Sequence, residues 1–285
     1  MYILEKYKKH NRYNDQYDEV YNYLLTYCDK GYNEHFHWAR FEWMIGHPML
    51  EADQLDHIVL FRNQDGILEG MLTFDTFYGD RYYIIHNNNE CLVREMVDFI
   101  SGQDGESAIV KVNSKDALLI NILQEKQFVQ KQIEEHVLQI PLSKQYTYHI
   151  SGDYQVSPED FALDKYKYQT VIHKGFDHQG MPDKNEEQYV ISSPHSNNSL
   201  KIFAFDEQEY CAHCGIWYTE GETAYIEPVV TIPRCRKQGL GRAVVYEALN
   251  RAGKLGAKRA IVLSGQEFYY SLGFQDSSEF ALWGK

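Results

Sequence analysis

Hydrophobic and polar positions along this chain predict a repeated order of strands and helices. Short apolar runs rich in β-branched and aromatic residues have the composition of strands, and longer stretches with apolar residues every three or four positions have that of helices. An aromatic-rich helical pattern over residues 18–49 opens the first half. This half then predicts strands at residues 57–62, 67–74 and 82–86, a helix at 90–100, a strand at 107–112, a helix at 116–126 and a strand at 136–142.

The second half repeats this order. Ser157 followed by Pro158 has the residue types of a helix N-cap and first turn, so we expect a helix to begin there. The remaining pattern predicts strands at residues 188–192, 200–205, 210–218 and 224–232, a helix at 236–255, a strand at 257–263 and a short helix at 266–271.

The similar order of the two halves favours a duplicated α/β unit. Gln127-Phe128 stands where Gly273-Phe274 stands in the second half, each pair just after a short helix, although few residues are identical. A polar stretch at residues 143–152 lies between the two patterns and is the expected boundary. A single domain with a long helical extension is the alternative.

Composition narrows the partners and the location. The chain has 285 residues, enough for one large domain or two ordinary ones, and 44% of them are hydrophobic. Its net charge is −13 without a long Lys/Arg cluster, which disfavours nucleic acid and anionic membranes as partners. The sequence lacks a bilayer-length apolar run, an apolar signal segment and an even set of cysteines, so a cytoplasmic location is expected.

The most informative stretch is T-I-P-R-C-R-K-Q-G-L-G at residues 231–241. It joins a strand-type run to an amphipathic helix, and its glycines allow close approach to the unpaired N–H groups of the helix N-terminus. This arrangement predicts a diphosphate ligand. A dinucleotide-binding fold fits poorly because Gly241 is followed by Arg242-Ala243-Val244, without the third glycine, and a P-loop is excluded because no G-K-[ST] follows.

Two signatures together carry a family resemblance. One is R-x-x-G-x-G at Arg236, Gly239 and Gly241 after the strand P-V-V-T, and the other is F-Y-Y-S-L-G-F at residues 268–274. In this order they resemble the GNAT superfamily of acyl-CoA-dependent N-acyltransferases over roughly the last 130 residues. The first half resembles it only in layout, with Asn87-Asn88-Asn89 in place of the loop.

The resemblance implies an α/β (α+β) fold with two GNAT-like domains. Each would have a mixed, mostly antiparallel central sheet flanked by helices. Residues 1–145 would form a degenerate N-terminal domain, and residues 146–285 the catalytic domain that binds acetyl-CoA.

The resemblance also implies a set of cofactor-binding residues. Val229, Val230 and Thr231 would offer main-chain groups to the pantetheine arm, and an N–H here would polarise the thioester carbonyl. Side chains at Arg236, Lys237 and Arg242 would add positive charge, although a solvated helix start is the alternative for these three. The loop that would bind the pyrophosphate, aided by the helix dipole, consists of Arg236, Lys237, Gln238, Gly239, Leu240 and Gly241.

Tyr269 and Glu227 are the expected catalytic residues. Tyr269 matches the family tyrosine that donates a proton to the leaving CoA thiolate. The alternative is an aromatic residue packed against the sheet, and only one of Tyr269 and Tyr270 can point at the sulfur. Glu227 shares one strand face with residues 229 and 231, where it could act as base or bind a cationic substrate. A carboxylate that fixes the sheet edge is the alternative for Glu227, and His213 is an alternative base.

Two features depart from the family pattern or mislead. The asparagine that many members carry before the tyrosine is absent, and Ser264 is the substitute that we consider. Cys211 and Cys214 resemble half of a metal site, but no second pair follows at a suitable spacing, so no metal is expected.

These features lead to one main hypothesis and two alternatives. The chain is expected to transfer acetyl from acetyl-CoA to a primary amine by direct attack in a ternary complex. Acidity and Glu227 favour a small cationic acceptor, and the first half would form part of the acceptor cleft or the surface of a homodimer. A non-catalytic acyl-CoA-binding module would bind without turnover, and a nucleotide-binding oxidoreductase is disfavoured by the missing glycine.

Overall fold

The computed structural model describes residues 2–9, 12–30, 36–47, 50–75, 81–104, 108–184 and 192–285. Their contacts form two compact units. The first comprises Met1–Leu138, Leu263–Gly265 and Asp276–Lys285, and the second Gln139–Val262 and Gln266–Gln275. Because the last strand belongs to the first unit, the division is not a single cut between residues 145 and 146. The two domains expected at 1–145 and 146–285 therefore stay a prediction.

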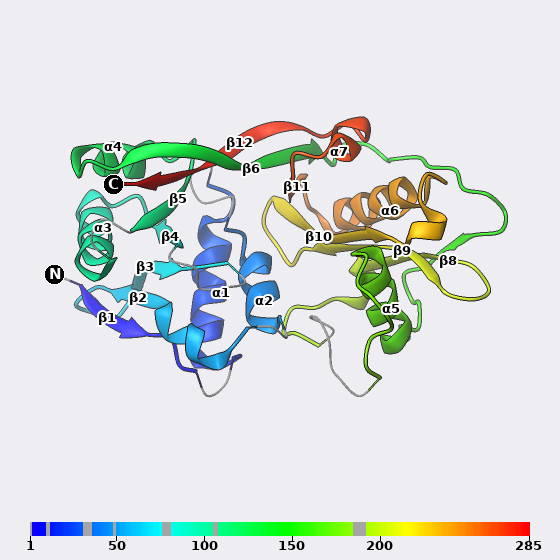
Figure 1. Cartoon of the computed structure of the whole chain (residues 1–285), viewed down its shortest axis with the longest axis horizontal. Helices are drawn as coiled ribbons and strands as arrows, with labels where there is room; N and C mark the ends of the chain where they lie inside the picture. The colour runs from blue at the N-terminus through cyan, green and yellow to red at the C-terminus, as the bar shows by residue number, and fades with distance from the viewer. Residues whose placement is uncertain are drawn as a thin grey trace. The chain divides into compact units, whose positions relative to one another are not determined.

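The first unit is a mixed, mostly antiparallel sheet with helices. Its strand order is β1-β2-β3-β4-β5-β12-β6, and only β4 and β5 form a parallel pair. Helices α3 and α4 close one hydrophobic core on this sheet, while α1 packs on β3 (Figure 1). The elements are β1 (Ile3–Lys6), α1 (Asp15–Tyr27), α2 (Trp38–Gly46), a 3₁₀ turn (Ala52–His57), β2 (Val59–Arg62), β3 (Leu68–Thr73), β4 (Arg81–His86), α3 (Glu90–Asp104), β5 (Ile109–Asn113), α4 (Ala117–Glu125), β6 (Val129–Pro141) and β12 (Gln275–Gly284).

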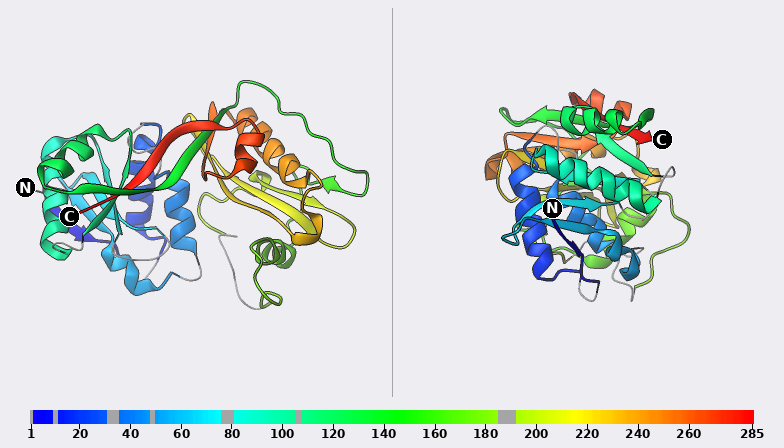
Figure 2. Two further views of the ribbon diagram at one scale, coloured as in Figure 1. Left: turned by 45° about the horizontal axis from the view of Figure 1, so that its top comes forward. Right: turned by 90° about the vertical axis from the view of Figure 1, so that its left-hand side faces the viewer.

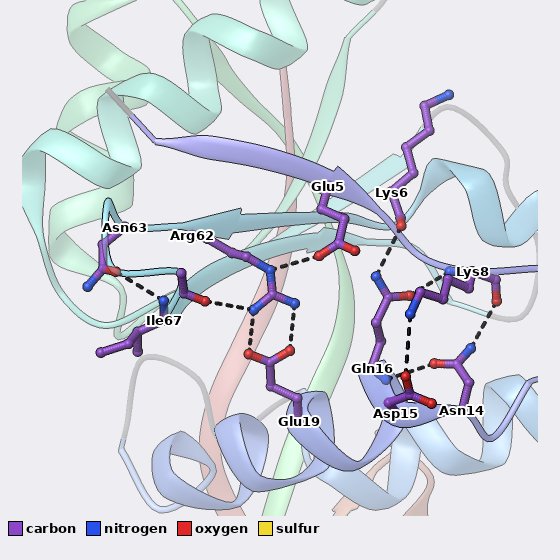
Figure 3. Close-up of polar contacts among 11 residues, drawn as sticks. Glu5, Lys6, Lys8, Asn14, Asp15, Gln16, Glu19, Arg62, Asn63 and Ile67 are labelled. Carbon is purple, nitrogen blue, oxygen red and sulfur yellow. Dashed lines mark hydrogen bonds and ion pairs between the residues drawn. The ribbon is translucent and has the colours of Figure 1, made fainter.

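Arg62 ties the edge strand of the first unit to α1 (Figure 3). Its guanidinium donates to Glu5 of β1 at 2.8 Å and forms a two-pronged ion pair with Glu19 of α1. Gln16 also links the end of β1 to α1, because its side chain accepts from the Lys8 N–H and donates to the Lys6 carbonyl. These contacts hold a four-residue strand that has only one neighbouring strand.

The second unit has the strand order β11-β10-β9-β8-β7. Only β10 and β11 pair in parallel. Helices α5 and α6 lie on opposite faces of the sheet (Figure 1), since Gly175 of α5 abuts Val230 and Gly241 of α6 abuts Thr231, the next residue of β10. The elements are β7 (Gln155–Val156), α5 (Lys165–Gly175), 3₁₀ turns (Asn198–Leu200 and Pro233–Cys235), β8 (Lys201–Phe205), β9 (Tyr210–Trp217), β10 (Thr223–Thr231), α6 (Leu240–Leu255), β11 (Arg259–Leu263) and α7 (Glu267–Ser271).

The sequence pattern placed most elements and misplaced a few. The helix expected at Ser157 is wrong, because Ser157 pairs with Phe203 of β8 through its main chain and its hydroxyl, and α5 starts after Asp164, which caps the Lys167 N–H. The helix expected at residues 236–255 begins at Leu240 rather than at Arg236 and follows a 3₁₀ turn. The strand expected at 188–192 lies mostly outside the described residues, and β1, β7 and β12 were not expected.

Long strands close the first unit. β12 pairs antiparallel with β5 over residues 280–284 and lies beside β6 (Figure 2). The amide of Asn113 also donates to the Ser278 hydroxyl at 2.9 Å, deep in the unit. Among the described residues, no helix is both long and apolar enough to cross a membrane.

Both units share a local turn after their last short helix. Gln127 and Gly273 each have a positive φ, 67° and 94°. The next N–H then reaches back five residues, from Phe128 to the Leu123 carbonyl and from Phe274 to the Tyr269 carbonyl. The correspondence that the sequence suggested is therefore present in the backbone, and it aligns Leu123 with Tyr269.

Candidate active site

The site starts where β10 separates from its parallel neighbour. β10 pairs with β11 only over residues 223–225, whereas its pairing with β9 continues to Thr231. Along an antiparallel strand, the main-chain N–H and C=O groups of every second residue point to the same partner strand. The Ile232 N–H donates to the Cys211 carbonyl of β9, which fixes the direction of this alternation. The main-chain groups of Val229 and Thr231 therefore point to the open edge, and those of Val230 point to β9.

A cavity of about 780 Å³ adjoins this edge. Three cationic side chains, Arg236, Lys237 and Arg242, line it, and none of the described residues in its wall is acidic. This is a notable lining for a chain with net charge −13. The wall consists of residues 147–149, Thr231, residues 235–237 and 239–242, Phe268, and residues 271–272.

The loop before α6 leaves the helix N-terminus open toward this cavity. Lys237 and Gly239 both have left-handed backbone conformations, with φ of 63° and 82°. Gly239 is the N-cap and offers no side-chain acceptor to the first turn of α6. A side chain at Gly241 would meet Thr231 Oγ1 and the Phe268 ring at 3.3 Å, so a larger residue there would have to push these neighbours aside. The arrangement presents amide donors and a positive dipole end to a ligand.

Other predicted loop residues have internal contacts. Arg236 donates from Nε to the Thr231 carbonyl at 3.0 Å and forms an exposed ion pair with Asp177 at 2.9 Å. Its side chain thus joins the end of β10 to the loop after α5 as well as lining the cavity. Gln238 donates to the Arg234 carbonyl at 3.1 Å and lies outside the cavity wall.

Tyr269 lies in α7 and is buried. Its ring packs edge-on against Phe274 at 5.6 Å between centroids. Burial raises the pKa of its hydroxyl well above the usual value. Cys214 and Glu227 make smaller contributions to this shift, so both lie near the Tyr269 hydroxyl. The hydroxyl therefore stays protonated near neutral pH.

Glu227 lies at a bulge of β10, and three neighbours hold it. The Tyr225 hydroxyl donates to Glu227 Oε2 at 2.6 Å, and the Trp217 indole donates to the Glu227 main-chain carbonyl at 2.8 Å. A side chain at Gly215 would lie 2.4 Å from that carbonyl, so β9 approaches it closely. Glu227 lines a second, small cavity of about 10 Å³, room for one water, next to Trp217 and Lys201.

His213 is fully buried on β9 and does not face the large cavity. Its Nδ1 lies 3.0 Å from the Ile202 carbonyl, and its ring stacks on Phe203. Burial lowers the pKa of His213 to about 3. A residue so enclosed has no path to an acceptor amine, which argues against it as the base.

The remaining candidates lie elsewhere. Ser264 belongs to the first unit, where its N–H donates to the His136 carbonyl at 2.9 Å, and it is not part of the cavity wall. In the part of the chain that the structure describes, no three His, Cys, Asp or Glu side chains are grouped so that they could hold a metal ion.

Sequence reasoning missed one wall of the cavity and one partner of Glu227. Thr147, Tyr148 and His149 line the cavity, although their polar stretch was taken only as a boundary. The two tyrosines at alternate positions, Tyr146 and Tyr148, and the following His149 were the available signal in this stretch. Tyr225 lies two residues before Glu227 on the same strand, and the same-face rule applied to 227, 229 and 231 would have included it.

Comparison with known proteins finds a family model that matches part of the second unit. The model of the acetyltransferase (GNAT) family matches residues 166–274. No curated protein sequence is similar enough to match the chain.

Several solved structures resemble the whole chain. A GCN5-related N-acetyltransferase from Sphaerobacter thermophilus is 11% identical with a TM-score of 0.55, covering 100% of this chain and 95% of that one. A tandem GNAT protein from the clavulanic acid biosynthesis pathway is 8% identical with a TM-score of 0.57, covering 100% and 98%. N-myristoyltransferase from Saccharomyces cerevisiae, solved with myristoyl-CoA, is 12% identical with a TM-score of 0.52, covering 99% and 78%. At these identities the likeness concerns the fold, and it confirms the predicted fold class.

Proposed function

We propose that the second unit, in which the model of the acetyltransferase (GNAT) family matches residues 166–274, transfers acetyl from acetyl-CoA to a primary amine of a small, cationic acceptor. The observation that carries the proposal is the large cavity, whose charged wall residues are all basic and which meets the open N-terminus of α6. A polyanionic diphosphate fits this combination of dipole, amide donors and cations.

The donor would enter along the open edge of β10. Its diphosphate would bind at the loop, with backbone donors of Gly239, Leu240 and Gly241 and the side chains of Lys237 and Arg242. Its pantetheine amides would pair with the main chain of Val229 and Thr231, whose groups point to that edge. We assign Val230 and Ser264 no direct contact, because the main chain of Val230 faces β9 and Ser264 is not part of the cavity wall.

Transfer needs one bond formed and one broken. The amine nitrogen attacks the thioester carbonyl, loses a proton, and the carbon–sulfur bond breaks to release CoA as a thiolate. Tyr269 would give its proton to that sulfur, since its raised pKa means that it carries this proton at neutral pH. An N–H at the open edge of β10 would stabilise the developing oxyanion.

Glu227 would serve the acceptor side. Its carboxylate is oriented by Tyr225 and contributes to the field at Tyr269, which is consistent with a place near the reacting atoms. It could take the proton of the ammonium or hold a cationic group. The small cavity beside it must widen for an acceptor to enter, since it has room for only one water.

Ligand binding and turnover test the proposal together. Acetyl-CoA at one hundred times its dissociation constant should stabilise the folded chain by about 2.7 kcal/mol, seen as a higher melting temperature. A panel of polyamines, amino sugars and amino acids should include a compound that releases CoA, detected as free thiol. Binding without turnover across such a panel favours a non-catalytic acyl-CoA module, and the absence of any shift at millimolar acetyl-CoA contradicts the cofactor assignment.

A further inference from the structure

We propose that residues 147–149 bind the adenosine end of the donor, with the Tyr148 ring as the stacking surface for adenine; this rests on the acyl-CoA site proposed above. It specifies which class of acyl donor that site would accept. The donor is a free CoA thioester that carries its nucleotide, and an acyl group on the phosphopantetheine of a carrier protein is a poor donor.

The segment is built as a fixed wall rather than a loose connection. The side-chain amide of Asn250, in the middle of α6, accepts from the Tyr146 N–H at 2.8 Å and donates to the Tyr146 carbonyl at 2.9 Å. The Tyr148 hydroxyl donates to Glu247, one turn earlier in α6, at 3.1 Å. The carbonyl of His149 comes within 3.8 Å of where a side chain at Gly239 would begin. The segment therefore runs along α6 to its N-terminus.

The position of this wall matches the part of the donor that remains unassigned. The thioester must lie toward Tyr269, and the diphosphate at the start of α6, so the nucleotide lies beyond the diphosphate. There the half-buried Tyr148 and the exposed His149 face the cavity together with Lys237 and Arg242. An oriented aromatic ring stacks with a base, and an imidazole beside two cations suits a phosphate.

Calorimetric titration with acetyl-CoA and with acetyl-4′-phosphopantetheine, which lacks the adenosine part, tests the assignment. The unaltered protein should bind acetyl-CoA at least about ten-fold more tightly, the range of one base stacked on an aromatic ring. Tyr148→Ala should weaken acetyl-CoA binding by about ten-fold and leave the truncated donor within about two-fold. Tyr27→Ala, which removes a half-buried tyrosine of the first unit, should change neither constant.

His149→Ala provides a second variant that should fold normally, because the side chain is exposed. It should also weaken acetyl-CoA more than the truncated donor. Equal affinity of the unaltered protein for both donors, or an unchanged preference in both variants, overturns the nucleotide wall while acyl-CoA binding stands. If the unaltered protein binds neither donor, the proposed function itself fails.

Discussion

The two units share a strand, helix, strand and short-helix order, but they treat the start of the central helix differently. In the first unit, side chains accept the hydrogen bonds of the amide N–H groups at the start of α3. His86 Nδ1 accepts from the Asn88 N–H, Asn87 accepts from the Asn89 N–H, and Asn89 accepts from Cys91 and Leu92. In the second unit, Gly239 stands at the same place without a side chain. One helix start is capped by its own sequence, and the other has no side-chain cap.

In the first unit, two further positions that correspond to the candidate site are occupied by its own side chains. β4 pairs in parallel with β5 only at Arg81 and Tyr82, so its strands also separate, but His86 then reaches Asp116 at 2.8 Å. Where the second unit has Tyr269, the shared turn places Leu123 in the hydrophobic core. The comparison teaches that a duplicated fold keeps its backbone when its site is filled with side chains, and that the unfilled copy is the one to examine for function.

Removing the hydroxyl that the first unit lacks should have the largest effect. Tyr269→Phe makes that position apolar, like Leu123, and should lower the rate of acetyl transfer by about 10²–10⁴-fold, the contribution of a positioned acid. The dissociation constant of acetyl-CoA should stay within about two-fold. Rapid-mixing kinetics with titration calorimetry separates the two, and Tyr270→Phe, next in the chain, is the matched control. A full rate in Tyr269→Phe would mean that another group protonates the sulfur.

Removing the contact between His86 and Asp116 in the first unit should lower the free energy of unfolding. Asp116→Ala removes a buried carboxylate that faces His86 and caps α4 at the Leu119 N–H. We expect a loss of about 2–4 kcal/mol in the free energy of unfolding, measured with urea. Asp98→Ala, at an exposed ion pair with Lys126, should cost less than about 1 kcal/mol. The comparison breaks if Asp116→Ala instead creates a second acetyl-CoA site.

The buried strand histidines sharpen the comparison through pH. His86 faces a carboxylate, whereas His213 lies against the Ile202 carbonyl and near the charge of Lys201, and burial lowers the pKa of His213 to about 3. The unfolded chain takes up a proton at this residue below pH 6.5, and the folded chain does not until about pH 3. Stability from His213 therefore falls as pH decreases through this window.

Between pH 7 and pH 5 this residue should cost about 2 kcal/mol. His213→Phe should show a correspondingly smaller drop in unfolding free energy over that range, whatever its stability at pH 7. Identical pH slopes in the two proteins would mean that His213 is protonated in the folded state.

The side-chain cap of the first unit should show the smallest effect. Asn89→Ala leaves the Cys91 and Leu92 N–H groups without their acceptor, which should cost about 1 kcal/mol. Asn22→Ala, at an exposed position inside α1, should be neutral or slightly stabilising in the same urea titration. An equal effect of both changes would show that the cap contributes nothing.

The sequence predicted the fold class and the glycine-containing loop before α6 because both rest on local patterns. Strand composition, helical spacing and two glycines in register can be read from neighbouring residues. β12 was missed because its place depends on pairing with β5, far away in the chain. Ser157 was misread as a helix cap because its partner, Phe203, lies 46 residues on.

The site shows the same limit. Residues 147–149 became a wall only through Asn250 and Glu247 of α6, which no local pattern connects to them. The burial of His213 and the assignment of Ser264 to the first unit also follow from tertiary packing. Local motifs thus indicate the ligand, and distant contacts decide which side chains can reach it.

The number of acetyl-CoA molecules bound per chain tests the central claim most directly. Calorimetric titration of the whole chain should give one site, and Gly241→Val, which crowds Thr231 and Phe268 at the open helix start, should abolish it. Two sites per chain, or one site that survives Gly241→Val in a folded protein, would contradict the account.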